Sequence, residues 1–286
     1  MSAQLMLPRE LDAASLCAWV TEWERVADLE ELLVQVPSDA FYRPIAVAVL
    51  AAGIADRRER GLRTRFETSE PQSAIWRYLQ RIDFFAALGV SAPESFSRQP
   101  PDVRFAPLVP IGDLAAARRH ADALSQCLER QLPELAPSPA RMARFILEEL
   151  GANVVQHSAR PRTGFGLAQA FSKFGRFELA FADRGVGFLA SLQRNPELQG
   201  RNLNDGEALQ LALSIGVSGA ADSRRNMGSG LKLLSNFSDH LGADLWIASG
   251  DSVLLRRNSV GGQRVTTVRA APRWQGTWIC LDAPIP

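Results

Sequence analysis

The chain has 286 residues, of which 46% are hydrophobic and 22% charged, and its 32 basic residues nearly balance 31 acidic ones. This composition is typical of a soluble globular protein and excludes collagen-like, coiled-coil and disordered chains. Because nucleic-acid-binding proteins ordinarily carry a basic excess, we expect no nucleic-acid partner. The length indicates about two domains, each large enough to bury a core.

The cysteines and the apolar segments point to a cytoplasmic protein. Cys17, Cys127 and Cys280 lie far apart, which favours neither a disulfide framework nor a zinc cluster and suits a reducing compartment. The first residues carry charge and lack an apolar segment, so we expect no signal peptide. The longest apolar run, residues 45–55, is shorter than the roughly 20 residues that span a bilayer. We therefore expect no membrane partner.

The first ninety residues alternate helical and strand patterns. Residues 11–27 have a helical pattern and residues 32–36 form a short strand pattern. Pro44 opens an alanine-rich helix that runs to about Glu59, because proline favours the first helical turn. A strand over 62–67, a helix over 74–81 and a structured segment over 84–88 are expected next. The alternation predicts a small α/β domain over residues 1–92.

A proline-rich stretch separates this domain from the rest of the chain. It shows no periodicity, so we expect a linker over residues 93–110 and a second domain over 111–286. The expected elements of the second domain are helices over 113–132, 138–157, 205–215 and 231–241, and strands near 164–171, 176–181, 245–248, 265–268 and 278–281. Helices followed by a run of strands predict an α/β sandwich in which one open face of the sheet is covered.

The helix that starts at Ser138 carries a polar stripe beside its apolar one. Glu149, Asn153 and His157 repeat every four residues, about 100° around the helix from the apolar stripe. A carboxylate, an amide and an imidazole thus line one flank next to the core. A solvated helix face with an incidental histidine would give the same pattern, so both interpretations stay open for this motif alone.

A second motif, FADRGVGF, directly follows the strand FELAF. Asp183 at the strand end can accept a hydrogen bond from an exocyclic amine. Gly185 and Gly187 allow the backbone to approach a ligand closely, with amides free to face a phosphate or a ring. A plain turn with a helix-capping aspartate is the alternative.

A third motif is NMGSGLKLL, residues 226–234. Gly228 and Gly230 precede a helix, and unpaired amides at a helix N-terminus attract anions. Lys232 in the first turn can add positive charge. The alternative is a flexible loop with ordinary glycines.

Taken in order, the three motifs resemble those of one protein family. EELGANVVQHS is similar to the N box of the Bergerat-fold ATPases (the gyrase, histidine kinase and MutL group), DRGVGF to the G1 box and GSGLKLL to the G2 box. The resemblance covers about residues 104–286. It implies an α+β sandwich, the Bergerat-fold ATP-binding domain, with ATP and Mg²⁺ as cofactors.

The resemblance also implies a role for each matching position. Asn153 would coordinate the Mg²⁺ that bridges the phosphates, Glu149 would orient or deprotonate the attacking water or acceptor hydroxyl, and Asp183 would bind the adenine amino group. The remaining matches are His157 near the phosphates, Gly185 and Gly187 around the base, and Gly228, Ser229, Gly230, Leu231 and Lys232 at the phosphate-binding helix start. Residues 195–229 would form a mobile lid that closes over ATP.

Two further features indicate which branch of this family the chain resembles. Lys232 stands where the full G2 pattern has its third glycine, and LKLLSNFSDHL is similar to the corresponding helix of anti-sigma-factor kinases. The N-terminal third, carried by VPSDAFYRPIAVAVLAAGIADRRERG and YLQRIDFFAALG, resembles STAS-like domains of the anti-sigma antagonists. Those domains carry a phosphorylatable Ser or Thr at the start of the corresponding helix. Here that helix begins Tyr42-Arg43-Pro44, and neither Ser38 nor Tyr42 matches well.

Two functions are therefore expected. One is a Mg-dependent ATP-binding regulatory protein that hydrolyses ATP or phosphorylates a partner protein. The other is an ATP-gated protein-interaction module with negligible turnover, which the fused STAS-like region favours. Both imply ATP or ADP and a regulatory protein as partners, and homodimerisation stays open. A sensor histidine kinase is not expected, because His120 lacks the acidic neighbour and following proline of a phosphoacceptor site.

Overall fold

The computed structural model describes most of the chain. Its described part leaves out residues 1, 95, 99–104, 132–136, 197, 214–229, 260–261 and 286, together with the side chains of residues 128, 131, 137–143, 157 and 161.

The protein is a mixed α/β structure with several sheets. The helices are α1 (Ala13–Val26), α2 (Pro44–Glu59), α3 (Ala74–Arg81), α4 (Phe84–Ala87), α5 (Leu114–Gln131), α6 (Pro137–His157), α7 (Gly187–Leu192), α8 (Asp205–Ala212) and α9 (Gly230–His240), with short 3₁₀ turns η1 (Pro161–Thr163) and η2 (Ser172–Phe174). The strands are β1 (Ser2–Met6), β2 (Glu10–Leu11), β3 (Glu31–Gln35), β4 (Phe41–Tyr42), β5 (Arg63–Glu67), β6 (Phe105–Pro110), β7 (Phe165–Phe171), β8 (Arg176–Asp183), β9 (Asp244–Asn258) and β10 (Arg264–Pro284). No helix among the described residues is long and apolar enough to span a bilayer.

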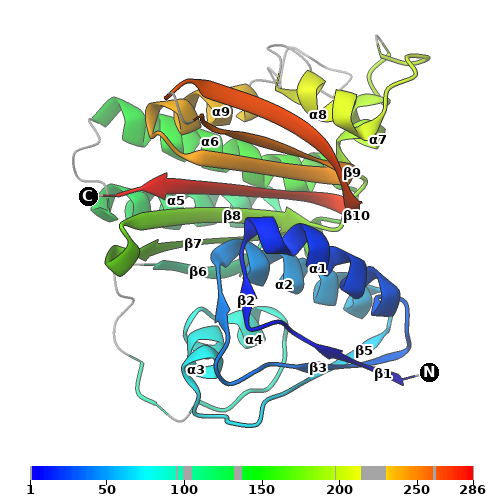
Figure 1. The fold of residues 1–286 in the computed structure, drawn as a ribbon, viewed down its shortest axis with the longest axis vertical. Helices are drawn as coiled ribbons and strands as arrows, with labels where there is room; N and C mark the ends of the chain where they lie inside the picture. Colours follow the sequence, from blue (N-terminus) through cyan, green and yellow to red (C-terminus); the bar gives the residue numbers. More distant parts are fainter. Residues whose placement is uncertain are drawn as a thin grey trace.

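A large five-stranded sheet forms the centre of the molecule. Its strand order is β6-β7-β8-β10-β9, and each neighbouring pair is antiparallel. Helices α5, α6 and α9 cover one face, whereas α1 and α2 cover the other (Figure 1). The sheet is therefore buried on both faces, which explains why strand β8 is buried along almost its whole length.

The N-terminal region, residues 2–94, builds a second, smaller sheet. Strands β1, β3 and β5 pair in parallel in that order, and α1 and α2 lie between this sheet and the large one (Figure 1). A short parallel pair, β2 and β4, precedes α1 and α2 respectively.

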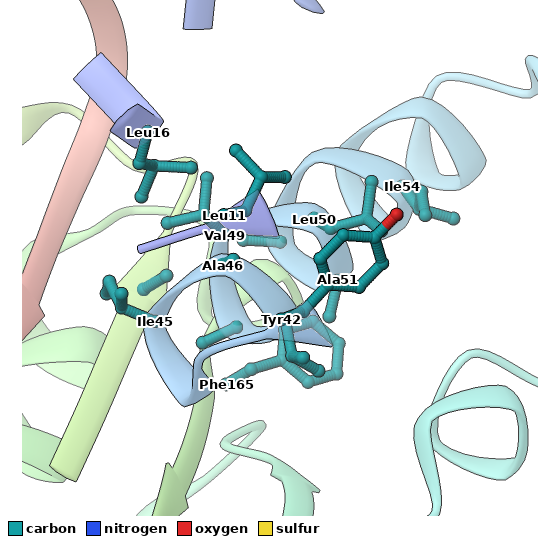
Figure 2. Close-up of a cluster of buried hydrophobic side chains, with 14 of the residues drawn as sticks. Leu11, Leu16, Tyr42, Ile45, Ala46, Val49, Leu50, Ala51, Ile54 and Phe165 are labelled. Atoms are coloured by element: carbon teal, nitrogen blue, oxygen red, sulfur yellow. The ribbon is translucent and has the colours of Figure 1, made fainter. Parts of the chain in front are cut away.

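Helix α2 explains how the two sheets are joined. It is buried continuously from Pro44 to Arg57, and a helix that is apolar on all sides is stable only inside a core. It contacts β5 of the small sheet and both β7 and β8 of the large one. Figure 2 shows Ile45 and Val49 of α2 in one cluster with Phe165 of β7. The N-terminal region and the large sheet therefore share one hydrophobic core.

The expected linker over residues 93–110 is wrong at its C-terminal end. Residues Phe105–Pro110 form β6, which pairs with β7 at the edge of the large sheet. The prolines that suggested a linker are compatible with this position, because an edge strand does not need every backbone N–H for pairing. The Leu108 amide also donates to the Ile82 carbonyl at 2.8 Å, so β6 contacts the N-terminal region as well.

The sequence predicts three closing strands, but the structure has two long ones, β9 and β10. The segments 265–268 and 278–281 both belong to β10, which has register shifts between Ala270 and Thr277. Arg256 of β9 and Arg264 of β10 both form ion pairs with Asp239 at the end of α9. The irregular middle of the hairpin breaks the sequence pattern without ending either strand.

Candidate functional site

A cavity lies between α6, α7, the start of α9, the end of β8 and the part of β10 around Thr277 and Ile279. Its lining includes Glu149 and Asn153 of α6, Asp183 at the end of β8, and Gly230 and Leu231 at the start of α9. Three segments that are far apart in the chain thus contribute to one cavity. Most of its walls are apolar, with a few polar groups among them, as is typical of small-molecule sites.

The polar flank of α6 faces this cavity. Glu149 and Asn153 lie one helical turn apart, and both are half-buried. Burial raises the pKa of the Glu149 carboxyl above its ordinary value, and the neighbouring carboxylate of Glu148 adds to that rise. A Cβ at Gly230 would lie 3.0 Å from Glu149 Cβ, so glycine allows the start of α9 to approach the carboxylate closely.

Asp183 enters the cavity because of the alternation of β8. Phe177, Leu179 and Phe181 pack on the α5–α6–α9 side, and Asp183 continues that side two residues further on. Its Oδ1 accepts a hydrogen bond from the Gly185 amide at 2.7 Å.

The surroundings of Asp183 favour a proton on its carboxyl. Burial raises its pKa to about 7, against the opposing effect of hydrogen bonds from the backbone of Gly185 and Thr277. Thr277 of β10 is paired with Asp183 in the sheet and lines the cavity as well. A buried carboxyl of this kind gains from a ligand donor, because a hydrogen bond to the charged form offsets the cost of burial.

The two glycines after Asp183 meet different steric demands. Gly185 lies so close to Ser158 that a Cβ on Gly185 would clash with it. Ser158 lines the cavity, whereas Gly185 is not among the lining residues. Gly187 lines the cavity, has φ +77°, and would place a Cβ 2.6 Å from Ser249 Oγ. Ser249 Oγ accepts from the Phe188 amide at 3.0 Å and donates to the Gly276 carbonyl at 3.0 Å. The loop is therefore held in a conformation that larger residues would disturb.

The remaining predicted residues fall into two groups. Lys232 is half-buried on α9 and is not among the residues that line the cavity. Gly228 and Ser229, residues 214–229 of the expected lid over 195–229, and the side chain of His157 lie outside the described part of the chain, whereas residues 205–212 of that segment form α8.

His120 occupies the core. It is buried on α5 against Gly166 and packs edge-on to Phe181. Burial lowers its pKa to about 4, so the imidazole is neutral near pH 7. An inaccessible, neutral histidine agrees with the expectation that it is not a phosphoacceptor.

The donor set of the cavity fits a cation that arrives with a phosphate ligand. No group of three or more His, Cys, Asp or Glu side chains among the described residues is arranged to hold a metal ion. Magnesium commonly binds one or two protein oxygens and completes its shell with phosphate and water. The Asn153 amide oxygen and the nearby Glu149 carboxylate are oxygen donors of this kind.

Several residues of the site gave no signal in the sequence. Thr277 reaches the cavity only through the pairing of β10 with β8, and Ser158 only through the loop that follows α6. Thr277 belongs to no motif, whereas Ser158 is the last residue of the EELGANVVQHS segment and had no role assigned to it there. No protein-family model matches the chain, and a search of curated proteins finds no match.

Proposed function

We propose that the cavity binds ATP together with Mg²⁺, and that the protein is a cytoplasmic regulatory protein that hydrolyses ATP or transfers its terminal phosphate to a partner protein. The observation that carries the proposal is the presence of Glu149, Asn153, Asp183 and Gly230 in the lining of one cavity. These are the positions at which the three sequence motifs resemble the Bergerat-fold ATPases. The N-terminal region is proposed to be a STAS-like domain.

The base end of the ligand would lie at Asp183. The Gly185 amide already binds Oδ1, and an exocyclic amine is a suitable donor for the other carboxylate oxygen. Val154, Phe181 and Ile279 line the same cavity and offer apolar surface to a purine ring.

The phosphate end would lie between α6 and the start of α9. Amides at the N-terminus of α9 favour an anion, and Gly230 leaves space for close approach. Asn153 would contribute an oxygen to Mg²⁺, which would neutralise phosphate charge. Glu149 would orient the attacking water or hydroxyl and accept its proton, for which a carboxyl with a pKa raised toward neutrality is well suited.

The test of the proposal compares the wild type with Glu149→Ala. Binding of ATP, ADP and GTP is measured by calorimetry, and phosphate release is measured in parallel. We expect the wild type to bind adenine nucleotides and to release phosphate, and Glu149→Ala to bind ATP while phosphate release falls by about 10² or more. A wild type that binds no adenine nucleotide would contradict the proposal.

The second candidate is an ATP-gated interaction module with negligible turnover. The shared core of the N-terminal region and the large sheet favours it, because binding at one face of the sheet can then alter the region packed on the other. At the start of α2, Arg43 and Pro44 stand in place of a phosphorylatable residue, and the Glu178 carboxylate accepts from the Ile45 amide at 2.8 Å. Nucleotide binding without phosphate release or phosphotransfer would select this candidate.

A further inference from the structure

We infer that Glu24 and Asp56, two carboxylates of the N-terminal region, are positioning residues for the nucleotide pocket and act through Arg184 and Arg160. The inference rests on the proposed function for its ligand, an adenine nucleotide. Two loops of the pocket, residues 158–163 and 184–188, are called the pocket loops below. Their positioning can be tested without any ligand.

Arg184 connects the pocket loop to the opposite face of the sheet. It follows Asp183 directly, so the alternation of β8 directs the two side chains to opposite faces. Asp183 lines the cavity, whereas Arg184 is buried among α1, α2 and β10, where its side chain is 6% exposed. The backbone that presents the Asp183 carboxylate is thus continuous with a residue held by the N-terminal region.

Three contacts hold the Arg184 guanidinium. Its Nη1 donates to Glu24 Oε1 of α1 at 2.5 Å, and its Nε lies 3.9 Å from Asp56 Oδ2 of α2. The guanidinium also lies 4.4 Å above the Trp274 ring, and the Trp274 indole N–H donates to the Asp183 carbonyl at 3.0 Å. The same indole therefore contacts Arg184 and fixes the backbone of Asp183.

Asp56 also holds the second loop of the pocket, which follows α6. Arg160 of this loop donates to Asp56 Oδ1, and the Arg160 amide donates to Ser158 Oγ at 3.0 Å. Ser158 lines the cavity. The Asp56 carboxylate of the N-terminal region thus contacts an arginine from each of the two pocket loops.

The two loops are also tied to each other. The Arg184 amide donates to Thr163 Oγ1 at 3.0 Å, and the Val186 amide donates to the Ser158 carbonyl at 2.9 Å. Displacement of either arginine therefore disturbs both loops.

Charge and burial make this arrangement sensitive to substitution. Asp56 is 3% exposed and carries a further ion pair with Arg60 at 3.2 Å. When one partner of a buried ion pair is neutralised, the remaining charge is left unpaired and moves toward water or another acceptor. A displacement of about 1 Å in a group that contacts a ligand is enough to weaken binding of that ligand. We therefore expect Asp56→Asn to reduce nucleotide affinity.

The chain offers a matched control at the other end of β8. Glu178 is as buried as Asp56 and forms an ion pair with Arg43 at 2.6 Å across the same interface. It lies five residues before Asp183, about 16 Å along the strand. Glu178→Gln therefore disturbs the interface without touching the pocket loops.

The first experiment measures hydrogen exchange in the ligand-free protein. In Asp56→Asn we expect the amides of residues 158–160, 162–163 and 184–188 to exchange about tenfold faster than in the wild type, with Asp56→Glu restoring most of the protection. Glu178→Gln should leave these amides unchanged. Unchanged exchange in Asp56→Asn, or equal loss in Glu178→Gln, would overturn the inference. If Asp56→Asn does not fold, Glu24→Gln is used, because the Glu24 side chain is 35% exposed.

The second experiment measures the Kd for ADP. We expect Asp56→Asn to weaken binding about tenfold and Glu178→Gln to leave it unchanged. Asp56→Asn should add little in a background that carries both Arg160→Met and Arg184→Met, because Asp56 acts through these two arginines. Unaltered ADP affinity in Asp56→Asn would overturn the inference. If the wild type binds no adenine nucleotide, the proposed function fails, and the exchange experiment alone decides whether the carboxylates position the loops.

Discussion

Strand β8 carries a buried carboxyl near each end, and the two have different surroundings. Burial raises the pKa of both Glu178 and Asp183 to about 7. Arg43 and the Ile45 amide occupy the two oxygens of Glu178, on the face that packs against the N-terminal region. Asp183 faces the cavity on the other side of the sheet, where the Gly185 amide binds one of its oxygens.

This difference separates an acid that holds layers together from one that is available to a ligand. Glu178 has its charge balanced within the protein, and its contacts cross from the large sheet to the start of α2. Asp183 has backbone donors and an open cavity in front of it. Burial alone therefore does not identify a binding residue; the unfilled acceptor capacity does.

Glu178→Ala is expected to produce the largest change in stability. It leaves the Arg43 guanidinium, which is 14% exposed, with the partly exposed Asp282 carboxylate at 3.0 Å in place of its buried partner. The free energy of unfolding should therefore fall by about 3 kcal/mol, the lower end of the range for a broken buried pair. Urea denaturation measures this change. The double variant Arg43→Met, Glu178→Met should recover much of the loss. A double variant as unstable as Glu178→Ala would show that the pair's charges are not the cause.

Asp183→Asn should leave the fold intact and weaken nucleotide binding. The amide cannot carry the charge that strengthens the hydrogen bond to an amine, so we expect the Kd for ADP to rise roughly 10- to 100-fold. Calorimetry measures the affinity, and thermal unfolding checks the fold. Equal affinity in Asp183→Asn would remove this carboxylate from the base pocket.

The ionisation of Glu178 and Asp183 should make the stability of the fold and the affinity for ADP change in opposite directions with pH. Their folded-state pKa values of about 7 exceed those of the unfolded chain, about 4. Their contribution to stability is therefore complete below about pH 4 and is lost as the pH rises through 7. Binding to an amine donor needs ionised Asp183, so ADP affinity should decrease as the pH falls below 7, by at most about tenfold per pH unit.

Urea midpoints and ADP titrations between pH 5 and pH 8, on the order of one measurement per half unit, test both directions. In Asp183→Asn the ADP affinity should lose most of this pH dependence, while the part of the stability change that comes from Glu178 remains. Affinity that rises on acidification would contradict the assignment of Asp183.

Gly187→Ala compared with Gly61→Ala should give the smallest effect. Both glycines have positive φ, +77° and +75°, but Gly61 has open space around it, whereas Gly187 lies against Ser249 Oγ. We expect Gly61→Ala to cost about 1 kcal/mol from backbone strain and Gly187→Ala to cost more. Thermal unfolding measures both. Equal losses would show that the Ser249 contact yields without cost.

Local elements were the most predictable part of the fold. Helix α2 begins at Pro44 and ends at Glu59, as expected from proline at the first turn and Gly61 after the end, and α3 spans residues 74–81 as expected. The signals for such helices lie within a few residues of their ends. The segments misassigned as a linker and as separate closing strands depend on sheet pairing, for which no local signal exists.

The candidate site also has a part that the sequence predicts locally and a part that only the fold decides. Glu149 and Asn153 share a helix flank through their spacing, and Asp183 and Gly187 share one loop, so each pair was recognisable as a unit. The structure brings both pairs and Gly230 to one cavity. Their roles toward ATP and Mg²⁺ stay predictions.

The sequence by itself determined the helices, the alternation of β8 and the order of its three glycine- and carboxylate-bearing motifs, because each depends on neighbours within a turn or a strand. Only the tertiary structure decided that Thr277 lies beside Asp183, that α2 is enclosed by two sheets, and that Arg184 meets Glu24, 160 residues away in the chain. Contacts at such separation follow from strand order and from which face of the sheet each layer covers, and no local preference of the residues encodes either one.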